Sequence, residues 1–100
     1  MRKIVLLCAN GMSTGMLMNK MREAAAQTGY ECTINAYAIS QAQSVAADAD
    51  CVLIGPQVRY EKEGVQKLLP GVPVDVIEIT DYGRLRGDKV LAMAKKLIGD

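Results

Sequence analysis

Apolar and polar residues alternate along this chain in blocks that predict four strands separated by helices. Short apolar runs that end at glycine, proline or asparagine are typical of buried strands, and a polar–apolar alternation indicates a half-buried one. The predicted strands are Lys3–Cys8, Glu31–Tyr37, Cys51–Ile54 and Pro73–Ile79. Strands that alternate with helices indicate a parallel sheet with helices on both faces. We therefore expect an open α/β sheet of the flavodoxin-like, doubly wound type.

The segments between these strands have helical periodicity. The first helix is predicted to begin at Ser13 or Thr14, whose hydroxyls suit an N-cap, and to end near Gln27 before Gly29. The other predicted helices are a short one capped by Ser40, one from about Gln57 to Leu69, and one from Gly87 or Asp88 to Ile98. The tripeptide Asp81-Tyr82-Gly83 is expected to form a loop or a single turn.

Composition and charge narrow the range of functions. The chain has 100 residues, of which 50% are hydrophobic, and a net charge of +1. This length fits one domain spanning residues 1–100, and the balanced charge argues against a nucleic-acid partner. No apolar stretch approaches the about 20 residues of a membrane span, and Ile4 to Ala9 is too short for a signal peptide. We expect a soluble, cytoplasmic protein.

Histidine is absent from the sequence, which contains three cysteines, Cys8, Cys32 and Cys51. The absence of histidine removes the commonest general base and a common metal ligand. The odd number and wide spacing of the cysteines argue against a disulfide framework or a zinc site. We expect neither a metal nor an organic cofactor, so any chemistry must be carried by a cysteine or a carboxylate.

In an open parallel sheet the functional crevice lies beyond the carboxyl ends of the strands. Three segments are predicted to meet there: Cys8 to Thr14, Gly55-Pro56-Gln57, and Asp81-Tyr82-Gly83. Of the cysteines only Cys8 lies in this position, directly before a loop that leads into a helix. The other two cysteines are expected to be core residues.

A helix N-terminus after Cys8 suits thiolate and phosphate chemistry. Its partial positive charge and its N–H groups lower the pKa of a nearby thiol and can bind a phosphate without lysine or arginine. Gly11 permits a tight backbone path, and the hydroxyls of Ser13 and Thr14 can add hydrogen bonds. One short segment therefore predicts both a nucleophile and an anion-binding loop.

Three stretches resemble a known family: I-V-L-L-C-A-N-G-M-S-T, V-L-I-G-P-Q-V-R-Y, and D-Y-G before the last helix. They resemble the IIB components of the lactose, cellobiose and diacetylchitobiose branch of the bacterial phosphoenolpyruvate-dependent sugar phosphotransferase system, a resemblance that covers essentially the whole chain. It implies a phosphocysteine at Cys8. It implies a phosphate-binding loop made of Ala9, Asn10, Gly11, Met12, Ser13 and Thr14. The residues Gly55, Pro56, Gln57 and Tyr82 would flank this loop and face partner proteins.

The resemblance also implies partners and a reaction. A phosphohistidine on a IIA protein would donate to Cys8, which would then act as a protein-phosphocysteine–sugar phosphotransferase towards a sugar held by the membrane transporter IIC. The chain would be a monomer that makes transient contacts and is peripheral to the membrane through IIC. It resembles cellobiose and chitobiose proteins more than lactose ones. The resemblance assigns no role to Gly15 or Arg59.

Two other functions fit the same loop. A low-molecular-weight tyrosine phosphatase, which has a similar fold, needs an arginine six residues after the cysteine, where this chain has Thr14, and an acid that is often followed by proline. Neither Asp75 nor Asp81 precedes a proline. A cysteinyl phosphate should then resist hydrolysis, which favours a carrier. In the third interpretation the chain is an interaction module in which Cys8 packs or responds to oxidants, although no second cysteine lies nearby in sequence.

Overall fold

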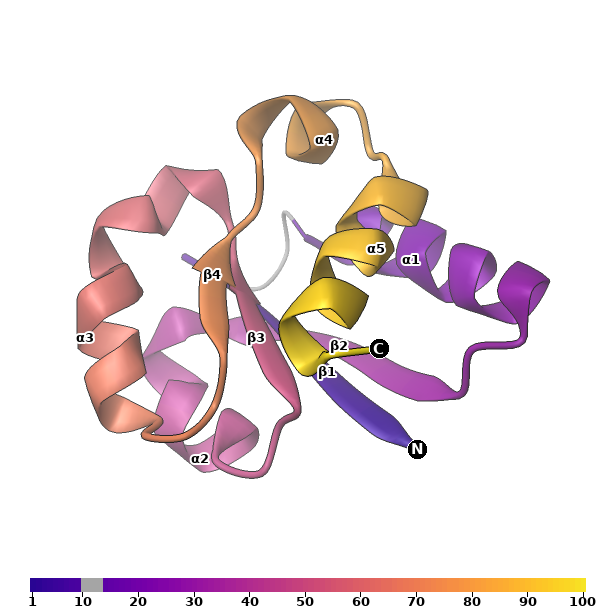
Figure 1. Ribbon diagram of the computed structural model, residues 1–100. Coiled ribbons are helices and arrows are strands. Elements are labelled where there is room, and N and C mark those ends of the chain that lie inside the picture. Colours follow the sequence, from indigo (N-terminus) through magenta and orange to yellow (C-terminus); the bar gives the residue numbers. More distant parts are fainter. Residues whose placement is uncertain (10–13) are drawn as a thin grey trace.

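The structure is a computed structural model that describes residues 1–9 and 14–100 (Figure 1). Within these residues the chain forms a four-stranded sheet in the order β2-β1-β3-β4, and every pair of neighbouring strands is parallel. The strands are β1 (Arg2–Cys8), β2 (Cys32–Ala38), β3 (Cys51–Ile54) and β4 (Val74–Val76). The predicted four-stranded parallel α/β fold is therefore confirmed.

Helices cover both faces of this sheet (Figure 1). They are α1 (Gly15–Thr28), η1 (Ile39–Gln41), α2 (Ala42–Ala46), η2 (Pro56–Glu61), α3 (Lys62–Leu68), α4 (Ile79–Gly83) and α5 (Gly87–Ile98), where η denotes a 3₁₀ helix. Residues of α1 and α5 pack in one hydrophobic cluster, and residues of α2 and α3 pack in the other. Among these described helices, no segment combines the length and the apolar character needed to cross a membrane.

The central strand β1 contributes to both clusters because successive side chains point to opposite faces. Ile4 and Leu6 pack in the cluster with α1 and α5, whereas Val5 and Leu7 pack in the cluster with α2 and α3. These four side chains are fully buried. A strand buried on both faces requires a continuous apolar run, which is what the sequence shows. The run ends at Cys8, on the carboxyl edge of the sheet.

The two helices on one face meet backbone to backbone at Gly87. A Cβ atom at this position would lie 2.3 Å from the carbonyl carbon of Lys20 and 2.5 Å from the backbone nitrogen of Met21. Glycine therefore allows the first turn of α5 to contact the middle of α1 directly. This contact fixes the start of α5 against α1.

Two predicted elements near the carboxyl edge were wrong in extent. The helix predicted from Gln57 to Leu69 consists of η2 and α3, and Val58 within η2 has a non-helical backbone (φ −120°, ψ 28°). The strand predicted to reach Ile79 ends at Val76. Its partner β3 ends at Ile54, which pairs with Val76, and the Glu78 carboxylate accepts a hydrogen bond from Asp81 N at 2.9 Å, which caps α4.

Smaller differences concern β2 and α2. The parallel register pairs Arg2 with Cys32 and Cys8 with Ala38, so β2 begins one residue later than predicted. Ser40 does not cap α2, because it lies inside η1 and Gln41 occupies the N-cap position. The first and last helices follow the prediction closely, and Gly29 ends α1 in the left-handed conformation (φ 70°).

Candidate functional site

Cys8 lies at the carboxyl end of the central strand, between two neighbouring strands. It pairs with Ala38 of β2, and on the β3 side the backbone nitrogen of Gly55 donates to the carbonyl oxygen of Leu7 at 2.8 Å. The residue is only 1% exposed. The structure therefore places this cysteine at the edge of the sheet where parallel α/β folds form their sites.

The contact between Cys8 and Thr14 brings together the two ends of the predicted phosphate-binding loop. The sulfur of Cys8 lies 3.6 Å from Oγ1 of Thr14, within hydrogen-bonding distance for sulfur, and Thr14 is fully buried. Ala9 is exposed. The predicted loop residues Asn10, Gly11, Met12 and Ser13 lie outside the described residues, so their proposed contacts with phosphate stay predictions.

Thr14 also marks the start of α1. It occupies the N-cap position, and its carbonyl oxygen accepts a hydrogen bond from Met18 N at 2.8 Å. The first turn of α1 contains no acidic residue, and it makes no capping hydrogen bond with the Thr14 side chain. The positive end of a 14-residue helix therefore begins beside the cysteine, an arrangement that favours an anion there.

Gly55 lets the segment after β3 approach the cysteine closely. A Cβ atom at Gly55 would lie 3.6 Å from Cβ of Cys8 and 3.1 Å from Oε1 of Gln57. The side chain of Gln57 therefore lies over the backbone that contacts Cys8. The structure brings the predicted flanking segment Gly55-Pro56-Gln57 to the cysteine.

A cavity of about 300 Å³ lies between η2 and α4 on this side of the molecule. Its lining residues are Pro56, Gln57, Arg59, Ile79, Tyr82 and Gly83. Tyr82 thus shares this cavity with the segment that follows Gly55, as the topology predicted. The guanidinium of Arg59 is held at its rim because Nη1 donates to the carbonyl oxygen of Pro56 at 3.0 Å.

Sequence reasoning missed Ile79 and gave Arg59 no role. Ile79 was predicted to end a buried strand, but it belongs to α4 and is 67% exposed. Arg59 lies three residues after Pro56 in a 3₁₀ helix, so its side chain returns to the proline carbonyl. The capping sequence that begins at Glu78 was the signal that could have located Ile79 on a helix.

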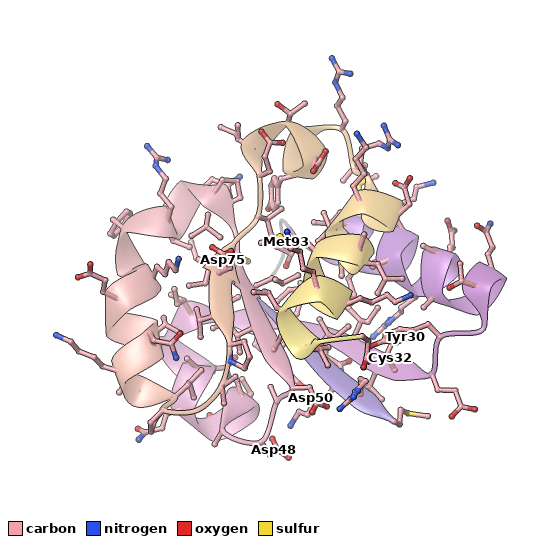
Figure 2. All side chains as sticks on the ribbon, viewed as in Figure 1. Tyr30, Cys32, Asp48, Asp50, Asp75 and Met93 are labelled. Carbon is pink, nitrogen blue, oxygen red and sulfur yellow. The ribbon has the colours of Figure 1, made fainter. Side chains whose placement is uncertain are left out.

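The other cysteines are in environments that disfavour thiolate. Cys51 is fully buried in the core, and this burial raises the pKa of its thiol to about 12. Cys32 is partly buried, and desolvation raises its pKa as well. Figure 2 shows Cys32 beside Tyr30, far from α4. Both shifts favour the protonated thiol at neutral pH, which is not the nucleophilic form of cysteine.

A larger groove of about 670 Å³ lies between β4 and α5. Asp75 and Met93 face each other across it (Figure 2), and Lys89 and Lys96 also line it. It includes none of the residues that the sequence predicted for the site. The smaller cavity is lined by Pro56 and Gln57, which directly follow the glycine that contacts Cys8.

Comparison with known proteins gives consistent results. The sequence model of the family described as "PTS system, Lactose/Cellobiose specific IIB subunit" matches residues 3–93. The galactose-specific EIIB component of Lactococcus lactis subsp. cremoris is 44% identical over 102 residues, an alignment that covers 95% of this chain and 94% of the relative. The cellobiose-specific EIIB component of Lactococcus lactis subsp. lactis gives the same identity and coverage. The oligo-beta-mannoside-specific EIIB component of Bacillus subtilis is 39% identical over 100 residues, covering 98% of this chain and 97% of the relative.

Solved structures agree on the fold. The solution structure of a cellobiose-specific phosphotransferase IIB component from Borrelia burgdorferi superposes with a TM-score of 0.83 at 33% identity, covering 98% of this chain and 92% of that one. The lactose-specific IIB domain from Streptococcus pneumoniae superposes with a TM-score of 0.80 at 22% identity, with 95% coverage of each chain, and supports the fold alone.

Proposed function

Because this chain belongs to the family of lactose/cellobiose-specific IIB subunits of the sugar phosphotransferase system, we propose that Sγ of Cys8 is the atom that carries the phosphoryl group. The observation that carries this proposal is the position of Cys8. Cys8 is the last residue of the central strand, and its Sγ lies 3.6 Å from Oγ1 of Thr14, the N-cap residue of α1. Helix N-termini stabilise both thiolates and phosphates, so this position suits both states of a carrier.

The proposed reaction has two transfers. In the first, the Cys8 thiolate attacks the phosphorus of a phosphohistidine on a IIA protein, so that the S–P bond forms and the P–N bond breaks. The electron pair of that bond returns to the ring nitrogen, and the imidazole leaves in its neutral form because its other ring nitrogen carries a proton. In the second, a sugar hydroxyl attacks the same phosphorus, the S–P bond breaks, and the hydroxyl proton passes to a base on the acceptor side. Backbone N–H groups of residues 9–14 are proposed to stabilise the phosphoryl oxygens.

The partner-facing surface is proposed to be the wall made by Gly55-Pro56-Gln57 and Tyr82. Cys8 is 1% exposed and ends β1 beside Ala38 of β2, so the carboxyl edge of the sheet is the proposed route of approach for both partners. The exposed side chains of Ile79 and Met16, each 67% exposed, add apolar area that a protein partner would bury. Because both partners would bind this same surface, IIA and IIC are proposed to bind one after the other.

Hydrolysis of the phosphocysteine is disfavoured by the surroundings. Thr14 occupies the position in which a phosphatase needs arginine, and it is fully buried. The carboxylate of Asp75 pairs with Lys62 at 3.2 Å and accepts a hydrogen bond from Val76 N at 2.8 Å, which keeps it on the edge of β4. These contacts support a carrier over a phosphatase.

The proposed acceptor is a cellobiose-type oligosaccharide bound by IIC, which places the working carrier at the cytoplasmic face of the membrane. The three relatives are named for galactose, cellobiose and oligo-beta-mannoside, so their names alone span several sugars. The chain is proposed to act as a monomer that binds each partner transiently.

Intact-protein mass spectrometry tests the carrier proposal. The chain is mixed with phosphoenolpyruvate, the two general phosphotransferase proteins and a IIA protein, beside the variants Cys8→Ser, Cys32→Ser and Cys51→Ala. One added phosphoryl group is expected on the wild-type chain, on Cys32→Ser and on Cys51→Ala, and none is expected on Cys8→Ser. Absence of the adduct with several IIA proteins, together with turnover of an aryl phosphate, would reject the carrier and favour a phosphatase.

A further inference from the structure

Thr14 places a hydroxyl in a region where the fold buries apolar groups. Among the residues that the structure describes, it is the single polar residue in the buried class, and none of its surface is exposed. Burying a hydroxyl is unfavourable unless the group is hydrogen-bonded. One hydrogen-bond partner of this hydroxyl is Sγ of Cys8, at 3.6 Å.

Regular secondary structure holds both partners of this contact. Cys8 is the last residue of β1 and is paired in register with Ala38 of β2. Thr14 is the N-cap residue of α1, and its carbonyl oxygen binds Met18 N. The side chain of Thr14 does not cap this helix. The strand and the helix therefore fix the backbone positions from which the sulfur and the hydroxyl approach each other.

The protonation state of the cysteine determines the direction of the hydrogen bond. With a thiol, either atom can donate. A thiolate has no proton, so the hydroxyl must donate to it. Hydrogen bonds to ionised groups are stronger than those between neutral groups. The contact therefore stabilises the thiolate more than the thiol, and more than a sulfur that shares its electrons with phosphorus.

We propose that Thr14 is a positioning residue for phosphoryl transfer, whose hydroxyl donates to the Cys8 sulfur and not to the phosphoryl oxygens. This rests on the proposed role of Cys8 as carrier. When the thiolate attacks, the S–P bond forms as the donor P–N bond breaks, and the hydroxyl loses a charged acceptor. When the sugar hydroxyl attacks, the S–P bond breaks, the electron pair returns to sulfur, and Thr14 donates to the leaving thiolate.

Removal of one hydroxyl tests this proposal. Thr14→Val replaces the hydroxyl with a methyl group at nearly constant shape, and Thr14→Ser keeps the hydroxyl. Thr33→Val, at an exposed position of β2, is the matched control. The pH midpoint of thiolate formation is followed by ultraviolet absorbance, with the curve of Cys8→Ser subtracted. The subtraction removes the absorbance of the other two cysteines and of the tyrosines, so the difference curve reports Cys8. Burial also raises the pKa of Cys51 to about 12 and raises that of Cys32, which keeps both thiols from titrating near neutral pH.

In Thr14→Val we expect the midpoint to rise by about one pH unit, which leaves about tenfold less thiolate below it. Thr14→Ser and Thr33→Val should stay near the wild-type midpoint. The rate of phosphorylation by IIA should fall about tenfold in Thr14→Val below the midpoint and recover above it. Circular dichroism checks that each variant is folded. If Thr14→Val does not fold, Thr14→Ala, which adds no apolar volume, replaces it, and its pH midpoint should also rise.

An unchanged midpoint in Thr14→Val and Thr14→Ala would overturn the proposal, and slower phosphorylation in those variants would then assign the hydroxyl to the phosphoryl oxygens. The titration needs no partner protein. A shifted midpoint in a chain that no IIA protein phosphorylates would therefore uphold the Thr14 contact and reject the carrier function.

Discussion

The backbone nitrogen of Gly55 donates a hydrogen bond to the carbonyl oxygen of Leu7 at 2.8 Å, immediately before the cysteine. This bond extends the pairing of β1 and β3 by one residue beyond Ile54. It brings the Gly55-Pro56-Gln57 segment to the side of Cys8, where a Cβ atom at Gly55 would be 3.6 Å from Cβ of Cys8. The wall of the cavity and Cys8 are thus joined through the sheet.

A methyl group at Gly55 should disturb this wall without unfolding the protein. The backbone of Gly55 is extended (φ −60°, ψ 142°), which alanine adopts without strain, and the tightest contact of the new methyl group is Oε1 of Gln57 at 3.1 Å. We expect Gly55→Ala to change the free energy of unfolding by less than about 1 kcal/mol. If Gln57 belongs to the proposed partner surface, its displacement should slow phosphorylation by IIA about fivefold. Quenched time courses measure the phosphorylation rate, and urea titration measures the free energy of unfolding. A wild-type phosphorylation rate in Gly55→Ala would contradict the role of Gln57.

A charge on the exposed apolar rim should weaken partner binding. Ile79 is 67% exposed beside the cavity, whereas Leu68, which is 48% exposed at the end of α3, lines no part of it. We expect Ile79→Glu to raise the KM for IIA about five- to tenfold with little change in kcat, since a buried apolar contact is lost. Leu68→Glu is the matched control and should leave the KM unchanged. Equal effects of the two substitutions would show that the rim is not the docking surface.

Alanine should have opposite effects at two helical glycines, one packed between α1 and α5 and one with open space around it. At Gly87 the added Cβ would lie 2.3 Å from the backbone of Lys20, so the helices must separate. Gly87→Ala should lower the free energy of unfolding by at least about 2 kcal/mol. At Gly64, inside α3, the Cβ meets no atom within 4 Å, and Gly64→Ala should stabilise the protein by about 0.5 to 1 kcal/mol. Chemical denaturation measures both, and a neutral Gly87→Ala would contradict the backbone contact.

A charged cluster joins the two ends of the chain. The guanidinium of Arg2 donates to both carboxylate oxygens of Asp100, at 2.9 and 2.8 Å, and the hydroxyl of Tyr30 donates to the same carboxylate at 2.5 Å. The hydrogen bond from Arg2 lowers the pKa of Asp100 below its usual 3.8. Desolvation, aided by Asp100, raises the pKa of Tyr30 from 10.0 to about 12.

These two shifts predict how stability depends on pH. The lowered pKa of Asp100 means that its contribution is present above pH 3.8 and is lost as the pH falls through the folded-state value. The raised pKa of Tyr30 means that its contribution is present below pH 10.0 and is lost as the pH rises towards about 12. Asp100→Asn should therefore destabilise the protein at neutral pH and match the wild type in strong acid. A pH-independent difference between the two proteins would contradict this cluster.

Local sequence signals located most of the fold. The apolar run Cys51–Ile54 is a strand over those same residues, and the apolar stripe after Gly87 is a helix that ends at Ile98. These elements follow from periodicity and from glycine or proline at their ends. The position of Cys8 at the carboxyl edge followed from topology, because parallel strands place their carboxyl ends together.

What the sequence did not predict depends on contacts between distant residues. The end of β4 at Val76 is set by the length of β3 and by the carboxylate of Glu78. The proximity of the Thr14 hydroxyl to the cysteine sulfur requires the packing of α1 against the sheet. A residue that suits an N-cap equally suits a contact with a nucleophile, so the sequence alone assigned Thr14 to a cap or to the phosphate.

The central claim is that one phosphoryl group enters at Cys8 and leaves to a sugar. The most direct measurement follows labelled phosphate from phosphoenolpyruvate into the chain, and then from the isolated phosphoprotein into products when IIC membranes and cellobiose are added. We predict that label maps to the peptide containing Cys8 and is recovered as sugar phosphate in equal amount. Label on another residue, or its release as inorganic phosphate at the same rate without IIC, would contradict the account.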